Sequence, residues 1–296
     1  YDIPANQSGD GDKMKLVSFE TEGRASYGAV VGERVVDLGC AHGASHPTLA
    51  AFLGSGELER TAASISGAEG DLALGDITLQ PPIPNPSKMI GLGLNYRKHI
   101  VESGRDIPQY PMLFTRYADS MVGHDQPMIV PKVSDKLDYE GEMVVVIGQH
   151  CRHVKAADAF DVVAGYTCCN EGSVRDYQRH TIQFVPGKTF WHSGSFGPWI
   201  VTPDEAPAPD DMVLTTRLNG EVMQHTEVSD LLFKVPELIE YITRICPLDP
   251  GDVIITGTPD GVGCFREPPV FLKKGDVVEV EVTGLGTLSN PVDNEA

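Results

Sequence analysis

The sequence predicts an α+β fold that is rich in β-strands, with a small β-rich N-terminal domain followed by a larger domain built as a distorted β-sandwich or roll. Three observations predict this class. Short apolar segments are separated by Gly- and Pro-containing turns along most of the chain. Long helical patterns are few. Strands also do not alternate regularly with helices, as a doubly wound parallel sheet would require.

The N-terminal part begins with a segment that we exclude from the fold. Residues 1–13 are polar and lack periodicity, so we interpret them as an expression-derived extension or a disordered tail ahead of a native start at Met14. Residues 14–39 then predict three short strands in an antiparallel meander. A helix is expected near residues 48–58.

A proline-rich stretch at residues 80–88, QPPIPNPSK, predicts a crossing between two domains, because proline cannot continue a regular element. We therefore place a boundary near residue 82, between a small domain (14–82) and a larger one (83–296). The larger domain is expected to contain strands at residues 88–94, 111–116, 127–131, 138–148, 161–169, 196–201, 212–218, 252–257 and 277–283. Helices are expected at residues 96–104, 155–160, 172–180 and 234–245.

Composition and charge exclude several classes of function. The chain has 296 residues, of which 41% are hydrophobic and 22% charged, as in ordinary globular proteins. No apolar run approaches the roughly 18 residues that span a bilayer, so we expect no membrane partner. The net charge of −19, with no basic stripe to offset it, argues against nucleic-acid binding. A pocket with a few cations and a metal can still bind a small anionic substrate.

The six cysteines are predicted to be reduced and mostly buried. None forms a C-x-x-C pair, so the usual thiolate zinc pattern is absent. Cys168 and Cys169 are adjacent, and neighbours on a strand point to opposite faces, which makes them poor disulfide partners. Scattered cysteines without a visible secretory signal indicate a reducing, cytoplasmic setting.

The segment DYEGEMVVVIG, residues 138–148, carries the strongest candidate site. On a strand, Glu140 and Glu142 share one face, with Asp138 in line before them and Cα atoms about 6.5–7 Å apart. Two carboxylates at that spacing can converge on one cation. The second half of the segment is apolar and predicts a buried strand. Adjacent anions at the start of a buried strand need a cation or hydrogen-bond donors. The alternative interpretation is a solvated, charged edge strand.

A third carboxylate, Glu171, stands at the end of the strand predicted at residues 161–169, before a probable helix start. With Glu140 and Glu142 it would make an all-oxygen site. Such hard ligands suit Mg²⁺, Mn²⁺ or Ca²⁺ and not zinc or copper. Taken alone, Glu171 is more commonly explained as a surface charge or a helix cap.

Three further features could take part in chemistry. In a helix over residues 96–104, His99 and Glu102 lie at i and i+3, where the carboxylate can orient the imidazole and raise its basicity. Lys188 lies in an apolar, aromatic setting and could bind a substrate carboxylate or oxo group. Residues 256–263, TGTPDGVG, predict a turn that offers backbone N–H groups to anions. A structural histidine, a solvated lysine and an ordinary turn are the alternatives.

Together these segments resemble the fumarylacetoacetate hydrolase (FAH) family, from about residue 86 to the C-terminus. The matching stretches, in order, are GLGLNYRKHIVE, PMLFTRYADSMVGHDQPMIVP, DYEGEMVVVIG, GYTCCNEGSVRDYQ, GKTFWHSGSFGPWIV, LNGEVMQHTEVSDLLF and ITGTPDGVG. Seven such stretches in the right order make chance agreement very improbable. The resemblance implies a FAH-type mixed β-sandwich roll that forms a homodimer, and the small N-terminal domain is similar to those of longer family members.

The resemblance also implies a metal site. Glu140 and Glu142 match the two ligands of the family's Y-E-x-E strand, and Glu171 stands where the third ligand is more often Asp. The extra methylene of Glu171 changes the reach of that ligand. The implied cofactor is Mg²⁺ or Mn²⁺, with Ca²⁺ as an alternative.

Catalytic and substrate-binding roles are implied in the same way. His99 and Glu102 match a water-activating dyad carried on a lid, and Lys188 matches a lysine near the substrate oxo group. Arg116 stands where the family often has lysine, and its planar guanidinium binds carboxylates differently. The implied substrate-binding residues are Tyr110, Arg116, Gln224 and Thr258.

The hypothesis from sequence is therefore a metal-dependent hydrolase. It would cleave a C–C bond in a small anionic β-diketo acid, an acylpyruvate-type 2,4-dioxo acid, through a metal-bound enolate, giving pyruvate and a carboxylic acid. The same core could instead decarboxylate oxaloacetate, or isomerise or hydrate a 2-oxo-enoate. An alternative of another class is a non-catalytic metal- or ligand-binding protein on the same scaffold.

Overall fold

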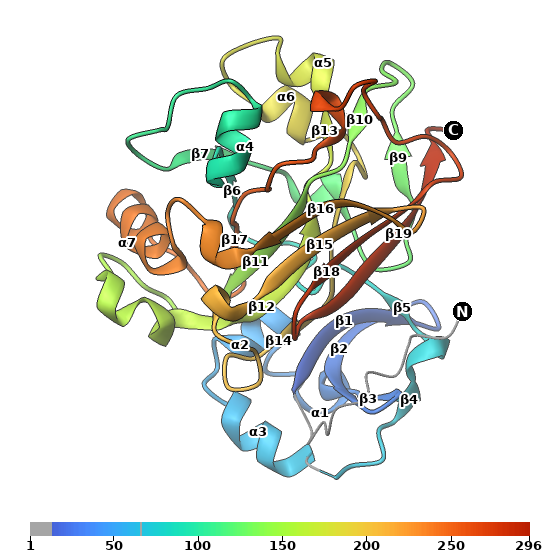
Figure 1. The fold of residues 1–296 in the computed structure, drawn as a ribbon. Helices are drawn as coiled ribbons and strands as arrows, with labels where there is room; N and C mark the ends of the chain where they lie inside the picture. Colours follow the sequence, from blue (N-terminus) through green and yellow to red (C-terminus); the bar gives the residue numbers. More distant parts are fainter. Residues whose placement is uncertain (1–13, 66) are drawn as a thin grey trace.

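The computed structural model of the protein describes residues 14–65 and 67–296 and confirms the strand-rich α+β class (Figure 1). Two β-sheets pack face to face, as the sandwich prediction requires. The predicted tail, residues 1–13, lies outside the described residues.

The larger sheet has twelve strands, and it combines the N-terminal strands with strands from the rest of the chain up to Ile255. Its path is β4 (Leu72–Ala73), β3 (Arg34–Val36), β2 (Arg24–Val31), β1 (Lys15–Thr21), β14 (Gly194–Val201), β12 (Val163–Asn170), β11 (Gly141–Ile147), β17 (Val253–Ile255), β6 (Met89–Gly93) and β7 (Met112–Thr115). Two short strands lie off this path: β5 (Thr78–Leu79) pairs with β1, and β8 (Met121–Val122) pairs with β14. Because β11 lies between β12 and β17, the alternative of a charged edge strand is wrong.

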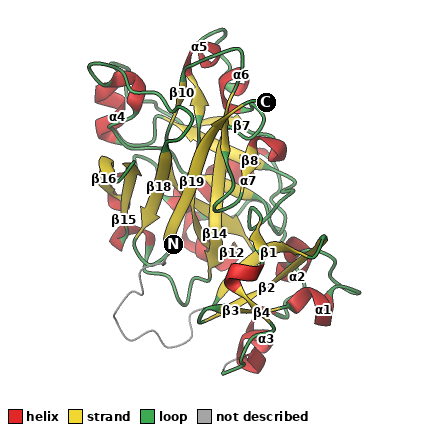
Figure 2. Cartoon of the chain, turned by 90° about the vertical axis from the view of Figure 1, so that its right-hand side faces the viewer, coloured by secondary structure: helices red, strands yellow, loops and turns green. Residues whose placement is uncertain are grey.

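The second sheet has five strands and covers one face of the first (Figures 1 and 2). In order they are β16 (Glu221–Glu227), β15 (Val213–Leu218), β18 (Val277–Val282), β19 (Gly286–Asn294) and β9 (Met128–Val130). A separate pair joins β10 (Leu137–Asp138) to β13 (Ser173–Val174). The sequence analysis missed β16 and β19, whose polar residues, and Pro291 in β19, hide the strand pattern.

The two faces of β11 pack into two different cores, as its period of two requires. Met143 and Val145 join the core between the sheets, with residues of the five-stranded sheet and of α7 (Val235–Ile245). Val144 joins the core that β1 and β2 share with the first helices. Cys168 and Cys169 divide between these cores in the same way, and both are free thiols as predicted. The prediction that cysteines are buried is wrong for Cys40, which is exposed.

Most other helices gather at the two ends of the molecule (Figure 2). α1 (Leu38–His42), α2 (Leu49–Leu53) and α3 (Leu58–Ile65) lie beside the N-terminal strands, and α4 (Arg97–Glu102), α5 (Arg175–Gln178) and α6 (Val185–Lys188) lie at the opposite end. The predicted helix near residues 48–58 corresponds to α2 and ends where α3 begins. Short 3₁₀ turns occur at Leu74–Asp76, Ala118–Ser120, Ala156–Val162, Pro209–Asp211, Val228–Asp230 and Gly263–Phe265. Among the described residues, no helix is long and apolar enough to cross a membrane.

Candidate active site

Three glutamates meet near the ends of the central strands. Glu140 directly precedes β11, Glu142 lies within it, and Glu171 directly follows β12. All three are buried, and each offers a carboxylate oxygen that lies within 4.8 Å of the others. The backbone N–H of Glu140 donates to Asn170 Oδ1 (2.9 Å), and that of Glu171 donates to the carbonyl of Glu140 (2.8 Å). Strand pairing therefore brings the three predicted ligands together, although the predicted strand 138–148 is interrupted before β11.

Three buried cations surround these carboxylates. The Nζ of Lys188 donates to Glu140 Oε2 (2.6 Å) and to Glu171 Oε2 (2.9 Å). Arg175 Nη1 lies 2.7 Å from Glu140 Oε1, and Arg116 Nη1 lies 3.7 Å from Glu171 Oε1. The side chain of Lys188 is only 3% exposed, so the alternative of a solvated loop lysine is wrong.

Two carboxylate oxygens have no hydrogen-bond partner among the described residues: Oε1 of Glu142 and Oε1 of Glu171. The other oxygen of Glu142 accepts from the backbone N–H of Gly257. Burial, followed by the charges of Glu171 and Glu140, raises the pKa of Glu142 well above its usual value. Buried anions without partners are costly, and hard oxygen ligands are what Mg²⁺ and Mn²⁺ prefer. The three residues therefore fit a divalent cation.

Glu140 differs from its neighbour in its electrostatic surroundings. Burial alone would raise its pKa, but Lys188 and Arg175 outweigh burial, and His99 adds to their effect, so the pKa of Glu140 is lowered. Burial likewise acts to lower the pKa of Lys188, yet the two carboxylates that it contacts raise it. The site thus keeps Glu140 as an anion and Lys188 as a cation.

The predicted dyad is assembled on α4. His99 Nδ1 lies 3.1 Å from Glu102 Oε2, and the backbone N–H of Gly261 donates to Glu102 Oε1 (2.9 Å). His99 is buried and its ring lies 6.1 Å from that of Phe265. His99 lies near enough to Glu140 to contribute to the lowering of its pKa. A Glu102 that is held at both oxygens can orient the imidazole.

The four predicted substrate-binding residues differ in their positions. Gln224 Nε2 donates to Thr258 Oγ1 (2.9 Å), and both residues bond to the backbone of Gly141 beside the carboxylates. Arg116 is buried, and it donates to Ser120, to Ser193 and to the carbonyl of Gly172. Tyr110 is 62% exposed and stacks on Tyr241 of α7. The structure therefore groups Gln224, Thr258 and Arg116 around the site and leaves Tyr110 at the surface; their roles toward a substrate stay predictions.

The sequence analysis missed Arg175 and its contact with Asp138. Arg175 links Glu140 to Asp138, whose Oδ2 lies 2.8 Å from Arg175 Nε. Asp138 therefore shares one guanidinium with Glu140, and it is not among the three residues whose oxygens converge. The spacing of Glu171 and Arg175 at i and i+4 was the available signal, but it indicates a helical pair and not the contact that forms.

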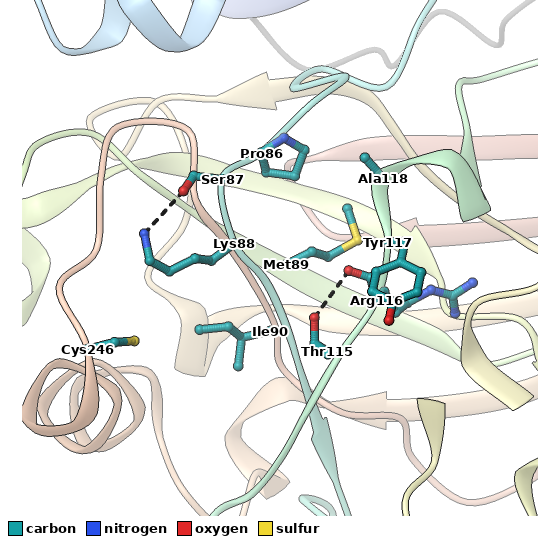
Figure 3. A pocket seen from close by; sticks show the side chains of 10 residues that line it. All are labelled: Pro86, Ser87, Lys88, Met89, Ile90, Thr115, Arg116, Tyr117, Ala118 and Cys246. Carbon is teal, nitrogen blue, oxygen red and sulfur yellow. Dashed lines mark hydrogen bonds between the residues drawn. The ribbon is translucent and has the colours of Figure 1, made fainter. Parts of the chain in front are cut away.

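A cavity of about 480 Å³ lies along β6 and the end of β7, and Arg116 is the site residue that lines it (Figure 3). It is lined by residues 86–90, residues 115–118 and Cys246. Lys88, which lines it, is already paired with Asp249 and Asp252. None of the three glutamates lines this cavity, so we assign it no part in the chemistry.

Comparisons with known proteins agree with the resemblance of the sequence. The family model described as fumarylacetoacetate (FAA) hydrolase, C-terminal, matches residues 88–293. A mitochondrial oxaloacetate tautomerase of Xenopus laevis is 37% identical over 94% of this chain and 90% of its own length. An oxaloacetate tautomerase of Bacillus subtilis is 41% identical over 74% of each chain. The structure of maleylpyruvate hydrolase from Sphingobium sp. SYK-6, in complex with manganese(II) and pyruvate, has a TM-score of 0.79 at 26% identity, covering 96% of this chain and 100% of that one.

Proposed function

Because the chain belongs to the fumarylacetoacetate hydrolase family, an enzyme family, we propose that it is a divalent-metal-dependent tautomerase of oxaloacetate or a closely related 2-oxo acid. The reaction interconverts the enol and keto forms of the substrate by moving one proton between oxygen and C3. The substrate class, a 2-oxo acid, is the one expected from the sequence, but the proposed reaction is tautomerisation and not C–C hydrolysis.

One observation carries the proposal: Glu140, Glu142 and Glu171 are buried together, and two of their carboxylate oxygens have no hydrogen-bond partner among the described residues. These three residues would hold the cation, for which Mg²⁺ and Mn²⁺ are the candidates. When bound, such an ion acts as a Lewis acid that stabilises negative charge on the 2-oxo oxygen of a substrate. That charge develops whenever a 2-oxo acid loses a proton at C3.

The charge balance of the site supports binding of a cation before an anionic substrate. The site contains five carboxylates, Asp138, Glu140, Glu142, Glu171 and Glu102, and three cations, Arg116, Arg175 and Lys188. Counted as fully ionised and with His99 neutral, these groups leave a net charge of −2, which a divalent cation would neutralise. A 2-oxo acid anion would then meet a site without net negative charge, so the ion would have to bind first.

The residues of the chain supply the remaining functions. With Nδ1–H donating to Glu102, the Nε2 atom of His99 carries the lone pair and can accept and return the proton. Lys188 holds a positive charge beside Glu140 and Glu171, where it can stabilise an anionic intermediate. Gln224 and Thr258 bond to the backbone of Gly141 and so fix the start of β11 between Glu140 and Glu142.

Tautomerisation needs fewer groups than hydrolysis does. One proton-transfer residue and a stabilised negative charge suffice, and His99, Lys188 and the carboxylates offer both. The Xenopus laevis relative, which matches 94% of this chain, and the Bacillus subtilis relative, which matches 74%, are both named for this reaction. Hydrolysis needs, in addition, a water positioned against a distal carbonyl.

The experiment follows the enol of oxaloacetate by its ultraviolet absorbance, with Mn²⁺ or Mg²⁺ and with excess EDTA. We expect loss of the enol above the rate in buffer with metal alone, and no acceleration in EDTA. Glu140→Ala should abolish the acceleration, and His99→Ala should lower it by about 10²-fold or more. A wild-type rate equal to that of buffer would exclude the tautomerase, and full activity of Glu140→Ala would exclude the metal site.

A second candidate is the C–C hydrolase of acylpyruvates that the sequence analysis ranked first, and it stays a prediction. The specific observation in its favour is the dyad, since Gly261 and His99 hold both oxygens of Glu102 as a water-activating pair would require. Release of pyruvate from acetylpyruvate or fumarylpyruvate, followed by NMR, would favour it. Conversion of oxaloacetate to pyruvate would instead indicate a decarboxylase.

A further inference from the structure

Asp138 is a buried carboxylate that the proposed reaction does not use. It is 0% exposed, and donors surround both of its oxygens. Oδ1 accepts from the backbone N–H of Gly263 (2.8 Å), and Oδ2 accepts from that of Cys264 (2.9 Å) and from Arg175 Nε (2.8 Å). The N–H of Tyr139 also donates to Oδ1 (2.9 Å). A carboxylate with this many donors is neither an available metal ligand nor a free base, which points to a positioning role.

One side of Asp138 leads to the dyad. The turn that it holds, residues 261–264, begins with Gly261, whose N–H donates to Glu102. The carbonyl of Gly261 accepts from the hydroxyl of Tyr139 (3.0 Å), the residue next to Asp138. Tyr139 and Asp138 therefore anchor the turn at Gly261, Gly263 and Cys264, directly after the amide that holds Glu102. Releasing the Asp138 anchor would free that amide and, with it, the orientation of His99.

The other side of Asp138 leads to the metal-binding carboxylates. Arg175 uses Nε for Asp138 and Nη1 for Glu140 Oε1 (2.7 Å), so one planar guanidinium joins the two anions. The side chain of Arg175 is 8% exposed, and Asp138 is the anion that balances its charge away from Glu140. Without Asp138, the whole charge of Arg175 would act on Glu140 and compete with a divalent cation.

We propose that Asp138 is the positioning residue that ties the metal-binding carboxylates to the His99–Glu102 dyad, through Arg175 on one side and the 261–264 turn on the other. This inference rests on the proposed metal role of Glu140. It predicts that loss of the Asp138 charge disturbs both halves of the site at once, although Asp138 touches neither the metal nor the substrate.

The test is Asp138→Asn, which keeps the size of the side chain but loses its charge and one acceptor. Mn²⁺ affinity, measured by isothermal titration calorimetry, should fall by about 10- to 100-fold, as is typical when a partner of a ligand is lost. Hydrogen exchange of the peptide that spans the 261–264 turn, measured by mass spectrometry on the metal-free protein, should be faster by about tenfold or more. Neither readout depends on turnover.

Asp252→Asn is the matched control. Asp252 is also 0% exposed, accepts from two backbone N–H groups, of Lys88 and Asp249, and pairs with the ammonium of Lys88. It precedes β17, whereas the turn follows that strand. The control should lose stability but keep the Mn²⁺ affinity and the exchange rate of the turn. Equal losses of affinity in both variants would overturn the proposal, because they would reflect general destabilisation.

Arg175→Lys separates the two sides, and it serves if Asp138→Asn fails to fold. Lysine keeps the charge but cannot reach Asp138 and Glu140 with one planar group. Glu140 then loses the contact that fixes its position, so Mn²⁺ affinity should fall, while exchange of the turn stays near the wild-type rate. Unchanged affinity in both Asp138→Asn and Arg175→Lys would overturn the proposal. Absence of Mn²⁺ binding by the wild type would instead refute the proposed metal site, and turn exchange in Asp138→Asn would still test the link to the dyad.

Discussion

At the scale of single residues, the site is held by the balance between buried anions and cations. Lys188 bridges Glu140 and Glu171, so in the metal-free protein its ammonium takes part of the role that a divalent cation would fill. Glu142 has no such partner and keeps one unbonded oxygen among the described residues. The residues that we propose to bind the cation are thus also residues on which the stability of the metal-free protein depends.

Lys188→Met should make this dependence visible. Removing one member of a buried ion pair leaves uncompensated charge and typically costs about 3–5 kcal/mol. We expect a lower melting temperature than wild type in EDTA and a larger increase on adding Mn²⁺, both measured by circular dichroism. Lys234→Met is the control, because Lys234 pairs with Asp210 at the surface and should cost at most about 1 kcal/mol. Equal melting temperatures of Lys188→Met and wild type in EDTA would contradict the expectation.

Glu142→Gln should have the opposite effect on the metal-free protein. The pKa of Glu142 is raised by burial and by Glu171, so its contribution to stability is full below the unfolded pKa of about 4.3 and is lost as the pH rises through the folded pKa. Gln removes that loss. At pH 7 in EDTA the variant should be more stable by about 1–3 kcal/mol, and the difference should shrink toward pH 4. Its Mn²⁺ affinity should fall. A variant that is less stable than wild type at pH 7 would argue against a buried, strained carboxylate.

The sequence predicted these residues to different degrees. The period of two on a strand was enough to pair Glu140 with Glu142, and helical spacing was enough to pair His99 with Glu102. The strand predicted over residues 138–148 was too long, because the chain leaves the sheet between β10 and β11. No local rule could show that Arg175 reaches back across 35 residues to Glu140.

At the scale of elements, the segment that follows β17, residues 257–264, holds carboxylates from separate parts of the site. Its amides donate to Glu142, Glu102 and Asp138, which come from three different elements. Gly261 lies at a φ of +96°, and a Cβ there would lie 2.3 Å from the carbonyl oxygen of Met223. The turn therefore requires glycine for both conformation and space.

Gly261→Ala should displace the turn and break its hydrogen bond to Glu102. We expect turnover to fall by about 10-fold or more, since misplaced catalytic groups lose rate steeply. Gly275→Ala is the control: it has a similar φ of +91° but no atom within 4 Å of the added Cβ, so it carries the conformational cost alone. Steady-state rates of both variants at saturating Mn²⁺ are the measurement. Comparable rates for the two would show that the position of the turn does not matter.

Strands and helices were predicted correctly where their apolar residues are continuous or periodic, and were missed where polar residues interrupt that pattern. β7, β11, β12 and α7 were predicted close to their observed bounds because their apolar patterns are continuous or periodic. β16 alternates imperfectly at an edge of the second sheet, and its polar side chains resemble those of a loop. Tertiary pairing forms such a strand, and a local pattern cannot reveal it.

At the scale of the whole molecule, the N-terminal segment shares a sheet and a core with the rest. β1 pairs with β14, and Leu16 and Phe52 belong to the same core as Val144 and Ile255. The sequence suggested a separate small domain, and its boundary near residue 82 stays a prediction. The pairing of β1 with β14 joins positions nearly two hundred residues apart and has no signal in either strand alone.

Phe52→Ala tests whether the two parts unfold together. Phe52 is fully buried, and truncating it should cost about 3–5 kcal/mol. Trp191 lies in the larger part, whereas Trp199 packs against the core of the N-terminal strands, so the test is made in a Trp199→Phe background. The fluorescence of Trp191 should then report a lower unfolding midpoint in the variant, at roughly 2–4 °C per kcal/mol. Val133→Ala, at a 60% exposed position, is the control. A tryptophan transition that stays at the wild-type temperature would mean that the N-terminal part unfolds independently.

The central claim is that Glu140, Glu142 and Glu171 hold a cation that makes a 2-oxo acid lose a proton at C3. The most direct measurement is exchange of the C3 protons of oxaloacetate for deuterium in D₂O, followed by proton NMR with Mn²⁺-free Mg²⁺ and with EDTA. The account predicts exchange faster than in buffer with Mg²⁺ alone, abolished by EDTA and by Glu140→Ala. Exchange at the buffer rate, or exchange that EDTA leaves unchanged, would contradict it.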